Sequence, residues 1–173
     1  MKLQLLSIVA LVTVLFSCGT TTNTSTSNNA AFDVPNSIQT VFSGQYPAAN
    51  NIIWSRYNTN TQPILDWEFA GWPAIDANHY TVRFTLDTIN YHAWYDAGGD
   101  WIGSAYLIRG VKALPDAVNS TIKAQFGSYS FDGAVREFRK NEEAYEIKLK
   151  NGDANKLKLM LDANGNILKQ KAG

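Results

Sequence analysis

The segment Ala144-Tyr145-Glu146-Ile147-Lys148-Leu149 alternates apolar and charged residues, and Leu157, Leu159 and Leu161 continue the alternation after it. Successive side chains of a β-strand point to opposite faces, so alternation places all the apolar side chains on one face. Antiparallel strands of this kind cover a helix with their apolar face and meet water with the other. The C-terminal part of the chain therefore predicts an antiparallel sheet packed against a helix.

The same pattern occurs earlier in the chain, in residues 79–84, and helix signals precede both copies. A proline stands where each helix begins, in Val34-Pro35 and again in Leu114-Pro115, and proline is favoured at the first turn of a helix. Apolar residues then recur at i, i+4 and i+8 and form one stripe on each helix: Ile38, Phe42, Tyr46 and Val118, Ile122, Phe126. Helix, strands and turns thus follow one order twice, which indicates an internal repeat.

The predicted fold class is α+β, with two tandem helix-plus-antiparallel-sheet units of the αββββ type. The units span residues 33–110 and 111–173, and they pack together or pair edge to edge. The spacing between matching residues falls from about 80 to about 66 along the chain, so the first unit carries an insertion at about residues 59–78. The predicted strands are 52–58, 79–87, 90–96, 101–108, 131–139, 144–150, 155–162 and 167–171.

Three short motifs of these units resemble the PepSY-like family, which is similar to the β-lactamase inhibitor protein. They are the V/L-P-x-x-I/V helix start, the Y-x-V/I-x-F/L strand and the D-A-x-G-x-W/I hairpin, and the resemblance covers residues 33–171. It implies a β-lactamase-inhibitor-protein-like fold in a secreted or lipid-anchored envelope protein. The inhibitor protein binds an enzyme through the open face of its tandem sheet. The resemblance brings no catalytic residues with it.

The N-terminus predicts a lipid anchor. An apolar stretch from Leu3 to Leu15 is too short to span a bilayer, and it ends in Leu15-Phe16-Ser17-Cys18, which resembles a bacterial lipobox. We expect residues 1–17 to be a signal peptide and Cys18 to be lipidated, with residues 18–32 as a Thr/Ser/Asn-rich tether. An ordinary secretory leader with an incidental cysteine is the alternative. No acidic cluster follows Cys18, which favours a periplasm-facing protein of the outer membrane.

Composition and motifs argue against several classes of function. Basic and acidic residues balance at 15 each, which speaks against a nucleic-acid partner. The sequence lacks a G-x-S-x-G nucleophile elbow and a phosphate-binding loop, so we expect no enzyme activity and no cofactor. His79 and His92 lack partners at metal-ligand spacing, and turn chemistry explains Asp162-x-Asn164-x-Asn166 better than a calcium loop does. Glu142-Glu143 is expected to be solvated.

All five tryptophans fall in the first unit, and two of them lie in the insertion. Trp67 and Phe69, spaced by two, fit an extra hairpin strand packed on the core. Alternatively, an aromatic recognition surface forms from Trp67, Trp72, His92 and Trp94, because Trp is a favoured anchor at interfaces. Trp94 would be exposed if Tyr91, Ala93 and Tyr95 point inward.

The predicted function is a lipid-anchored envelope binding module without catalytic activity. Its expected partners are the membrane, through the N-terminal lipid, and another envelope protein that it recognises in an inhibitor-like way. Binding of a small ligand or carbohydrate through the tryptophan-rich first unit is the alternative, and a purely structural role is a third. A concave pocket lined by tryptophan would favour the ligand, and a flat outer sheet would favour the protein partner. The sequence leaves the oligomeric state open.

Overall fold

The computed structural model describes residues 32–58, 64–153 and 155–173. The predicted signal peptide, Cys18 and nearly all of the tether lie outside these residues. The elements follow in the order α1 (Asn36–Gln45), β1 (Asn50–Arg56), α2 (Trp67–Ala70), β2 (Tyr80–Leu86), β3 (Ile89–Tyr95), β4 (Trp101–Ile108), the 3-10 turn η1 (Val111–Ala113), α3 (Asp116–Gln125), β5 (Ser130–Arg139), β6 (Glu142–Asn151), β7 (Asn155–Asp162) and β8 (Ile167–Ala172). The predicted mixture of helices and antiparallel strands is confirmed.

The eight strands form one sheet in the order β1 to β8, with each strand antiparallel to the next. The prediction of two tandem units, each with its own sheet, is wrong in that the strands form a single sheet, because β4 pairs with β5 from Ser104↔Phe138 to Ile108↔Ala134. Of the two arrangements that the sequence left open, this is edge-to-edge pairing. It satisfies the backbone N–H and C=O groups that two separate sheets would leave unpaired at their edges.

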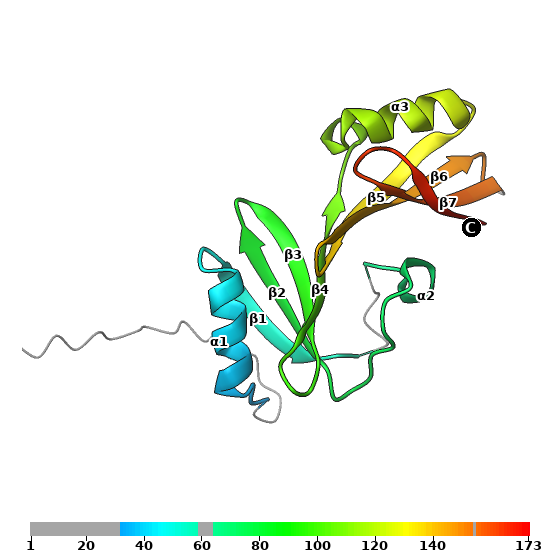
Figure 1. Ribbon diagram of the computed structural model, residues 1–173. Coiled ribbons are helices and arrows are strands. Elements are labelled where there is room, and N and C mark those ends of the chain that lie inside the picture. Colours follow the sequence, from blue (N-terminus) through cyan, green and yellow to red (C-terminus); the bar gives the residue numbers. More distant parts are fainter. Residues whose placement is uncertain (1–31, 59–63, 154) are drawn as a thin grey trace, which may run out of the picture.

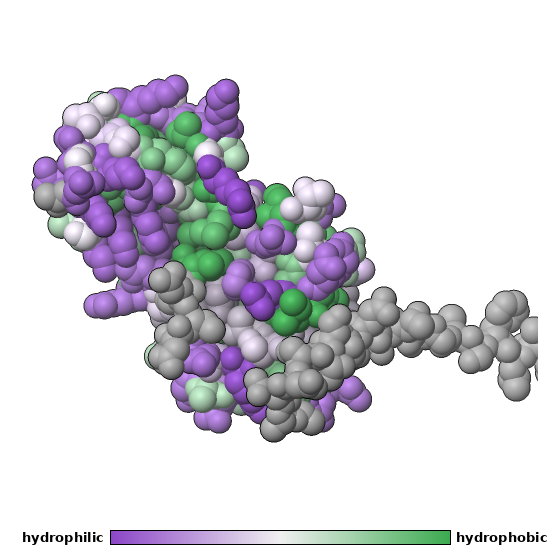
Figure 2. All heavy atoms as spheres, turned by 180° about the vertical axis from the view of Figure 1, so that it is seen from behind, coloured by the Kyte–Doolittle hydropathy of each residue, from purple (hydrophilic) through white to green (hydrophobic). Residues whose placement is uncertain are grey.

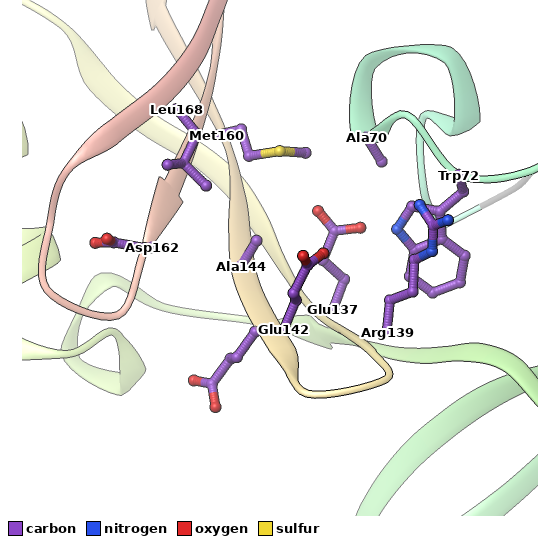
Figure 3. Close-up of a pocket in the computed structure, with 10 residues that line it drawn as sticks. Ala70, Trp72, Glu137, Arg139, Glu142, Ala144, Met160, Asp162 and Leu168 are labelled. Atoms are coloured by element: carbon purple, nitrogen blue, oxygen red, sulfur yellow. The ribbon is translucent and has the colours of Figure 1, made fainter.

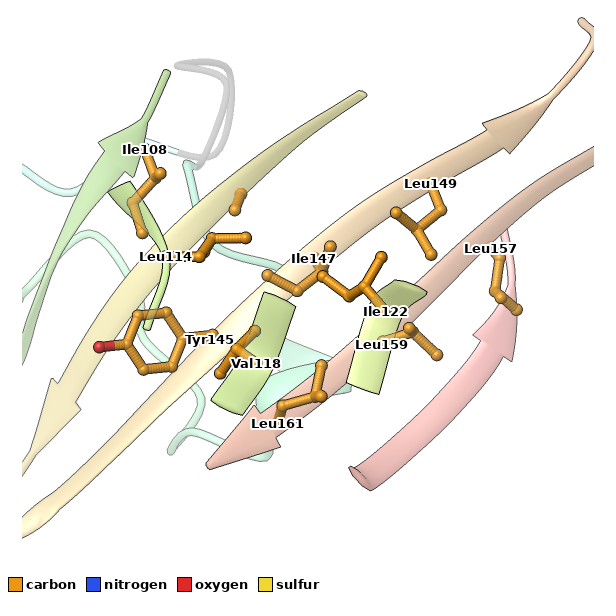
Figure 4. Close-up of a cluster of buried hydrophobic side chains, with 11 residues drawn as sticks. Ile108, Leu114, Val118, Ile122, Tyr145, Ile147, Leu149, Leu157, Leu159 and Leu161 are labelled. Carbon is orange, nitrogen blue, oxygen red and sulfur yellow. The ribbon is translucent and has the colours of Figure 1, made fainter. Parts of the chain in front are cut away.

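The helices α1 and α3 begin directly after Pro35 and Pro115, and both lie on the same face of the sheet (Figure 1). Ile38 and Phe42 of α1 pack on one aromatic-rich cluster with Tyr80, Val82, Phe84, Ala93 and Tyr95. Val118 and Ile122 of α3 pack on a second cluster, which is mostly aliphatic (Figure 4): Ile108, Leu114, Ala134, Tyr145, Ile147, Leu149, Leu157, Leu159 and Leu161. Each half of the sheet thus has its own helix and core.

A third cluster lies on the opposite face, where residues 64–78 cross the middle of the sheet. Leu65 and Trp72 pack there on Trp94, Ala105 and Val135. The extra strand expected around Trp67 and Phe69 does not form, because these residues form the short helix α2. Asp66 caps its N-terminus by accepting a hydrogen bond from the Phe69 N–H at 3.0 Å, and Gly71 ends it with φ +75°. Both caps are strong helix signals.

Candidate functional site

The four residues predicted as an aromatic surface lie together, but as a packed cluster. Trp67, Trp72 and Trp94 meet edge to face, with ring centroids 5.1 to 5.6 Å apart, and His92 stacks on Trp94 at 6.1 Å. Trp94 is 3% exposed and Trp72 is 8% exposed, because residues 64–78 cover them. Ala93 and Tyr95 point toward α1, so Trp94 lies on the opposite face of the sheet, as the sequence required for an exposed Trp94. The covering segment nevertheless buries the indole, so core packing explains Trp72 and Trp94.

Strands at the far end of the sheet hold the α2 segment in place. The Asp66 carboxylate accepts a hydrogen bond from Lys158 Nζ at 2.6 Å, and Lys171 Nζ lies 3.3 Å from the same oxygen. Burial acts to raise the pKa of Asp66, but the hydrogen bonds from Lys158, the Phe69 N–H and Lys171 hold it at about 2. Lys169 Nζ donates to the Phe69 carbonyl at 2.8 Å. The segment is therefore fastened to β7 and β8 by charged side chains.

A pocket of about 340 Å³ opens between the α2 segment and strands β5 to β8. Its volume lies at the small end of the range of ligand pockets, which is roughly 300–1,000 Å³. Glu137 points from β5 toward Met160 of β7 and Ala70 of α2, while Trp72 and Arg139 form the facing wall (Figure 3). Glu142, Glu143, Ala144, Asp162 and Leu168 complete the lining.

Two carboxylates are buried at this place on the sheet. Glu137 is 3% exposed and Glu146 is fully buried, and they lie diagonally across β5 and β6 because Glu137 pairs with Ala144 and Val135 with Glu146. One oxygen of Glu146 accepts the Asp66 N–H at 3.1 Å. Neither oxygen of Glu137 accepts a hydrogen bond of regular geometry among the described residues, although the Trp72 indole N–H lies close enough to lower its pKa. A buried carboxyl group with so little support is costly.

The surroundings of the two carboxylates favour their protonated forms. Burial raises the pKa of Glu137 to about 7, and the adjacent Glu146 adds to the shift. The Trp72 indole and the cations of Lys169 and Arg139 act in the opposite direction but do not cancel it. Burial also raises the pKa of Glu146, against the hydrogen bond from the Asp66 N–H. Glu137 is thus a carboxyl group that titrates near neutral pH inside a pocket.

Glu143 is not the solvated residue that the sequence predicts. Both of its oxygens accept hydrogen bonds from the Arg136 guanidinium, at 2.9 and 2.8 Å, and the Tyr145 hydroxyl donates to it as well. The guanidinium also lies over the Phe138 ring, 4.7 Å from its centroid. The hairpin turn itself falls on Lys140 and Asn141. Arg136 and Glu143 therefore form a half-buried ion pair beside Tyr145 rather than two solvated charges.

The face of β1 to β4 that points away from α1 is only partly covered. Ile53, Arg83, His92 and Ala105 form a row of paired residues across this face, and Leu107 lies beside the row on β4. Leu107 is 54% exposed and Ile53 is 48% exposed. We call Ile53, Arg83, His92 and Leu107 the open face. Burial and the nearby Arg83 lower the pKa of His92, so Arg83 is its charged member at neutral pH.

Hydrophobic side chains reach the surface between hydrophilic ones in the view from behind Figure 1 (Figure 2). Ile53 lies on β1 and Leu107 on β4, with Arg83 and His92 on the two strands between them. Arg83 is exposed and forms no ion pair within the described residues. The open face therefore offers two aliphatic side chains and one unpaired positive charge.

The predicted turn at Asp162 is confirmed. Its carboxylate accepts hydrogen bonds from the backbone N–H groups of Asn164 and Asn166, each at 2.9 Å. In the loop before β2, Nδ1 of His79 lies 2.8 Å from Oδ1 of Asp76, within hydrogen-bond distance. Within residues 32–58, 64–153 and 155–173, no three His, Cys, Asp or Glu side chains are grouped as metal ligands would be.

Sequence reasoning missed Glu137, Leu107 and Gly103. Glu137 and Leu107 occupy positions of strands that alternation assigns to the face away from the helices, where glutamate raises no suspicion. Gly103 lies under the Trp72 ring: a Cβ on it would lie 2.2 Å from Cη2 of Trp72. A glycine inside a strand is a signal of close approach by another group.

Comparison with known families matches one continuous part of the chain. A sequence model of the family described as "Putative beta-lactamase-inhibitor-like, PepSY-like" matches residues 78–169, which is more than half of the chain. The chain belongs to this family. The match extends from β2 to β8 and crosses the predicted boundary at residues 110–111. No curated protein matches the chain.

Solved structures of similar fold come from Bacteroides. A BLIP-like protein from Bacteroides fragilis has a TM-score of 0.65 at 19% identity, over 82% of this chain and 88% of the other. A DUF2874 family protein from Bacteroides ovatus has a TM-score of 0.64 at 17% identity, over 82% and 89%. A Bacteroides eggerthii structure described as "putative periplasmic" has a TM-score of 0.61 at 17% identity, over 82% of this chain and 90% of the other. At these identities the PepSY-like chain shares their fold.

Proposed function

We propose that this chain is a non-catalytic binding module of the bacterial cell envelope that recognises another protein through the open face. The observation that carries the proposal is the exposure of Leu107 and Ile53 on an uncovered sheet face, at 54% and 48%. Aliphatic anchors in a polar frame give an interface a core that excludes water. The partner that fits presents apolar side chains together with a carboxylate for Arg83.

Membership of a β-lactamase-inhibitor-like family supports an inhibitor-like role, in which the bound partner is itself an enzyme. A shared fold does not determine function, so the proposal rests on the exposed side chains of the open face. The description of one neighbour as periplasmic supports an envelope location. No helix within the described residues has the length and apolarity needed to cross a bilayer. Lipidation of Cys18, with the outer membrane as the address, is the anchor that we propose.

A photocrosslinking amino acid placed at Ile53 of the full chain tests the first proposal. We expect it to capture one envelope protein that the same crosslinker at Val41, an equally exposed site on α1 at 46%, does not capture. Leu107→Glu should remove the crosslinked product because it places a negative charge in the apolar core of the interface. Val41→Glu is the matched control and should leave the product unchanged. The same set of captured proteins from both positions would contradict the proposal.

Binding of a small ligand is the second function that an observation favours. The 340 Å³ pocket is lined by Trp72, as the alternative required. Trp67, Trp72 and Trp94 have their rings packed against one another, so a sugar has no free tryptophan face of the three to stack on. The pocket therefore favours a compact ligand over a carbohydrate chain. Titration of Trp72 indole resonances with small-molecule mixtures tests this function.

A further inference from the structure

The unpaired carboxylate of Glu137 is aimed into a cavity that no described side chain fills. It is 97% buried, it lines the pocket with the Trp72 ring, and neither of its oxygens accepts a hydrogen bond of regular geometry within the described part of the chain. Buried polar groups are almost always satisfied, so an exception requires an explanation. A ligand that donates hydrogen bonds to this carboxylate would supply one.

The charges around the pocket favour a cation over an anion. Among the acidic residues of the lining, Glu137 is the buried one, whereas Arg136 holds Glu143, Asn166 holds Asp162, and Glu142 is exposed. Arg139 is the one base of the lining. The Arg139 guanidinium donates to the Gly71 carbonyl at 3.0 Å, and Lys169 donates to the Phe69 carbonyl at 2.8 Å. Both cations close to Glu137 are thus directed at backbone oxygens of the α2 segment. Neither takes the place that a ligand would occupy at the carboxylate.

We propose that this pocket binds an alkylammonium group, with the ammonium on the Glu137 carboxylate and its alkyl chain against Trp72 and Met160. An ammonium has three donors, which suit two carboxylate oxygens that accept no regular hydrogen bond. The apolar lining from Ala70, Ala144 and Met160 suits the methylene chain. This inference rests on the second proposed function and names its ligand class.

Two sources supply the same chemistry, a free amine and a lysine side chain of a protein. The probes are therefore n-butylamine and Nα-acetyl-lysine methylamide, each with a neutral match, 1-butanol and the Nε-acetylated lysine derivative. Binding is followed in the full chain in non-ionic detergent, by the Trp72 indole N–H and Glu137 side-chain carboxyl resonances. Affinity for n-butylamine alone identifies a free amine, whereas equal or tighter binding of the lysine derivative identifies a protein side chain.

The expected result at pH 8 is at least tenfold tighter binding of either ammonium probe than of its neutral match. Glu137→Gln should weaken ammonium binding at least tenfold, since it keeps the shape and removes the charge, and Glu68→Gln on the exposed side of α2 should not. Ala144→Leu should block the pocket while leaving Glu137 intact. Equal binding of amine and alcohol, or unchanged affinity of Glu137→Gln, would overturn the inference.

Acidity gives an independent readout. Glu137 is surrounded by Glu146 on β6, Arg139 on β5, Lys169 on β8 and the uncharged Trp72, and its carboxyl must be ionised to attract an ammonium. Affinity should therefore fall as the pH is lowered from 8 to 5.5, and this dependence should vanish in Glu137→Gln. If a neutral compound binds instead, the inference fails and the small-ligand function stands. If no compound moves the Trp72 resonance, both fail.

Discussion

Replacing Gly103 by alanine tests how tightly the α2 segment lies on the sheet. A Cβ at this position would lie 2.2 and 2.4 Å from two ring atoms of Trp72 and 2.7 Å from the Phe138 carbonyl oxygen. Because ordinary van der Waals contact begins near 3.4 Å, the indole has to move by about an ångström. That movement opens the cluster that Trp72 forms with Trp67 and Trp94.

Overpacking of a buried site typically costs about 1–3 kcal/mol, and the upper end applies here because backbone and ring are both too close. Alanine also lowers the conformational entropy of the unfolded chain, which raises the free energy of unfolding by about 0.4–1 kcal/mol. We expect a net loss of about 2 kcal/mol in the free energy of unfolding, equivalent to a Tm lower by roughly 4–8 °C for a domain of this size.

Urea unfolding followed by tryptophan fluorescence measures this loss directly. The matched control is Gly110→Ala, where an added Cβ meets no atom within 4 Å, and it should be neutral or slightly stabilising. Trp72→Leu combined with Gly103→Ala should recover part of the loss, because the shorter side chain leaves room for the methyl group. Equal stability of the two glycine variants would refute the close approach of Trp72 to the strand.

Three other substitutions test the charged groups around the pocket. The pKa of Glu137 is about 7 in the folded chain against an ordinary 4.5, so the wild type loses stability as the pH rises between these values. In urea unfolding, Glu137→Gln should be more stable than the wild type by up to about 3 kcal/mol at pH 8 and equally stable near pH 4.5. A stability difference that does not change with pH would contradict this expectation. The pKa of Asp66 is about 2 in the folded chain against an ordinary 3.8, so the ionised carboxylate stabilises the fold above pH 3.8 and this contribution is lost as the pH falls through 2. Asp66→Asn should therefore lower the free energy of unfolding by about 2 kcal/mol at pH 7 and by much less near pH 2. Arg136→Lys should cost about 1 kcal/mol, because lysine cannot hold both Glu143 oxygens in a fork, and an unchanged Tm would show that the fork is dispensable.

The strands and long helices followed from the sequence because their patterns are local. Tyr145, Ile147 and Leu149 face α3 in the structure as their alternation predicts, and Pro35 and Pro115 stand directly before the helices that they predict. A period of two or of nearly four residues needs no knowledge of the rest of the fold. These elements could therefore be placed within about two residues.

The pocket could not be found in this way because it depends on which segment covers the second face of the sheet. Glu137 and Glu146 stand at positions that alternation assigns to solvent, and they are buried only because residues 64–78 cross over them. The helix α2 is four residues long, too short to show a period, while the two-residue spacing of Trp67 and Phe69 suggested a strand. Asp66 and Gly71 were the signals that could have indicated a capped helical turn.

The fastening of the α2 segment to the last two strands fixes when it can fold. Asp66 and Lys158 are 92 residues apart in the chain, and Phe69 and Lys169 are 100 residues apart. Contacts of such long range form late, because the intervening chain must first be ordered. Until β7 and β8 are in place, the segment lacks the lysines that hold it over the tryptophans. Closure of the tryptophan cluster is therefore expected to be the last step of folding, visible as a slow fluorescence phase after the sheet has formed.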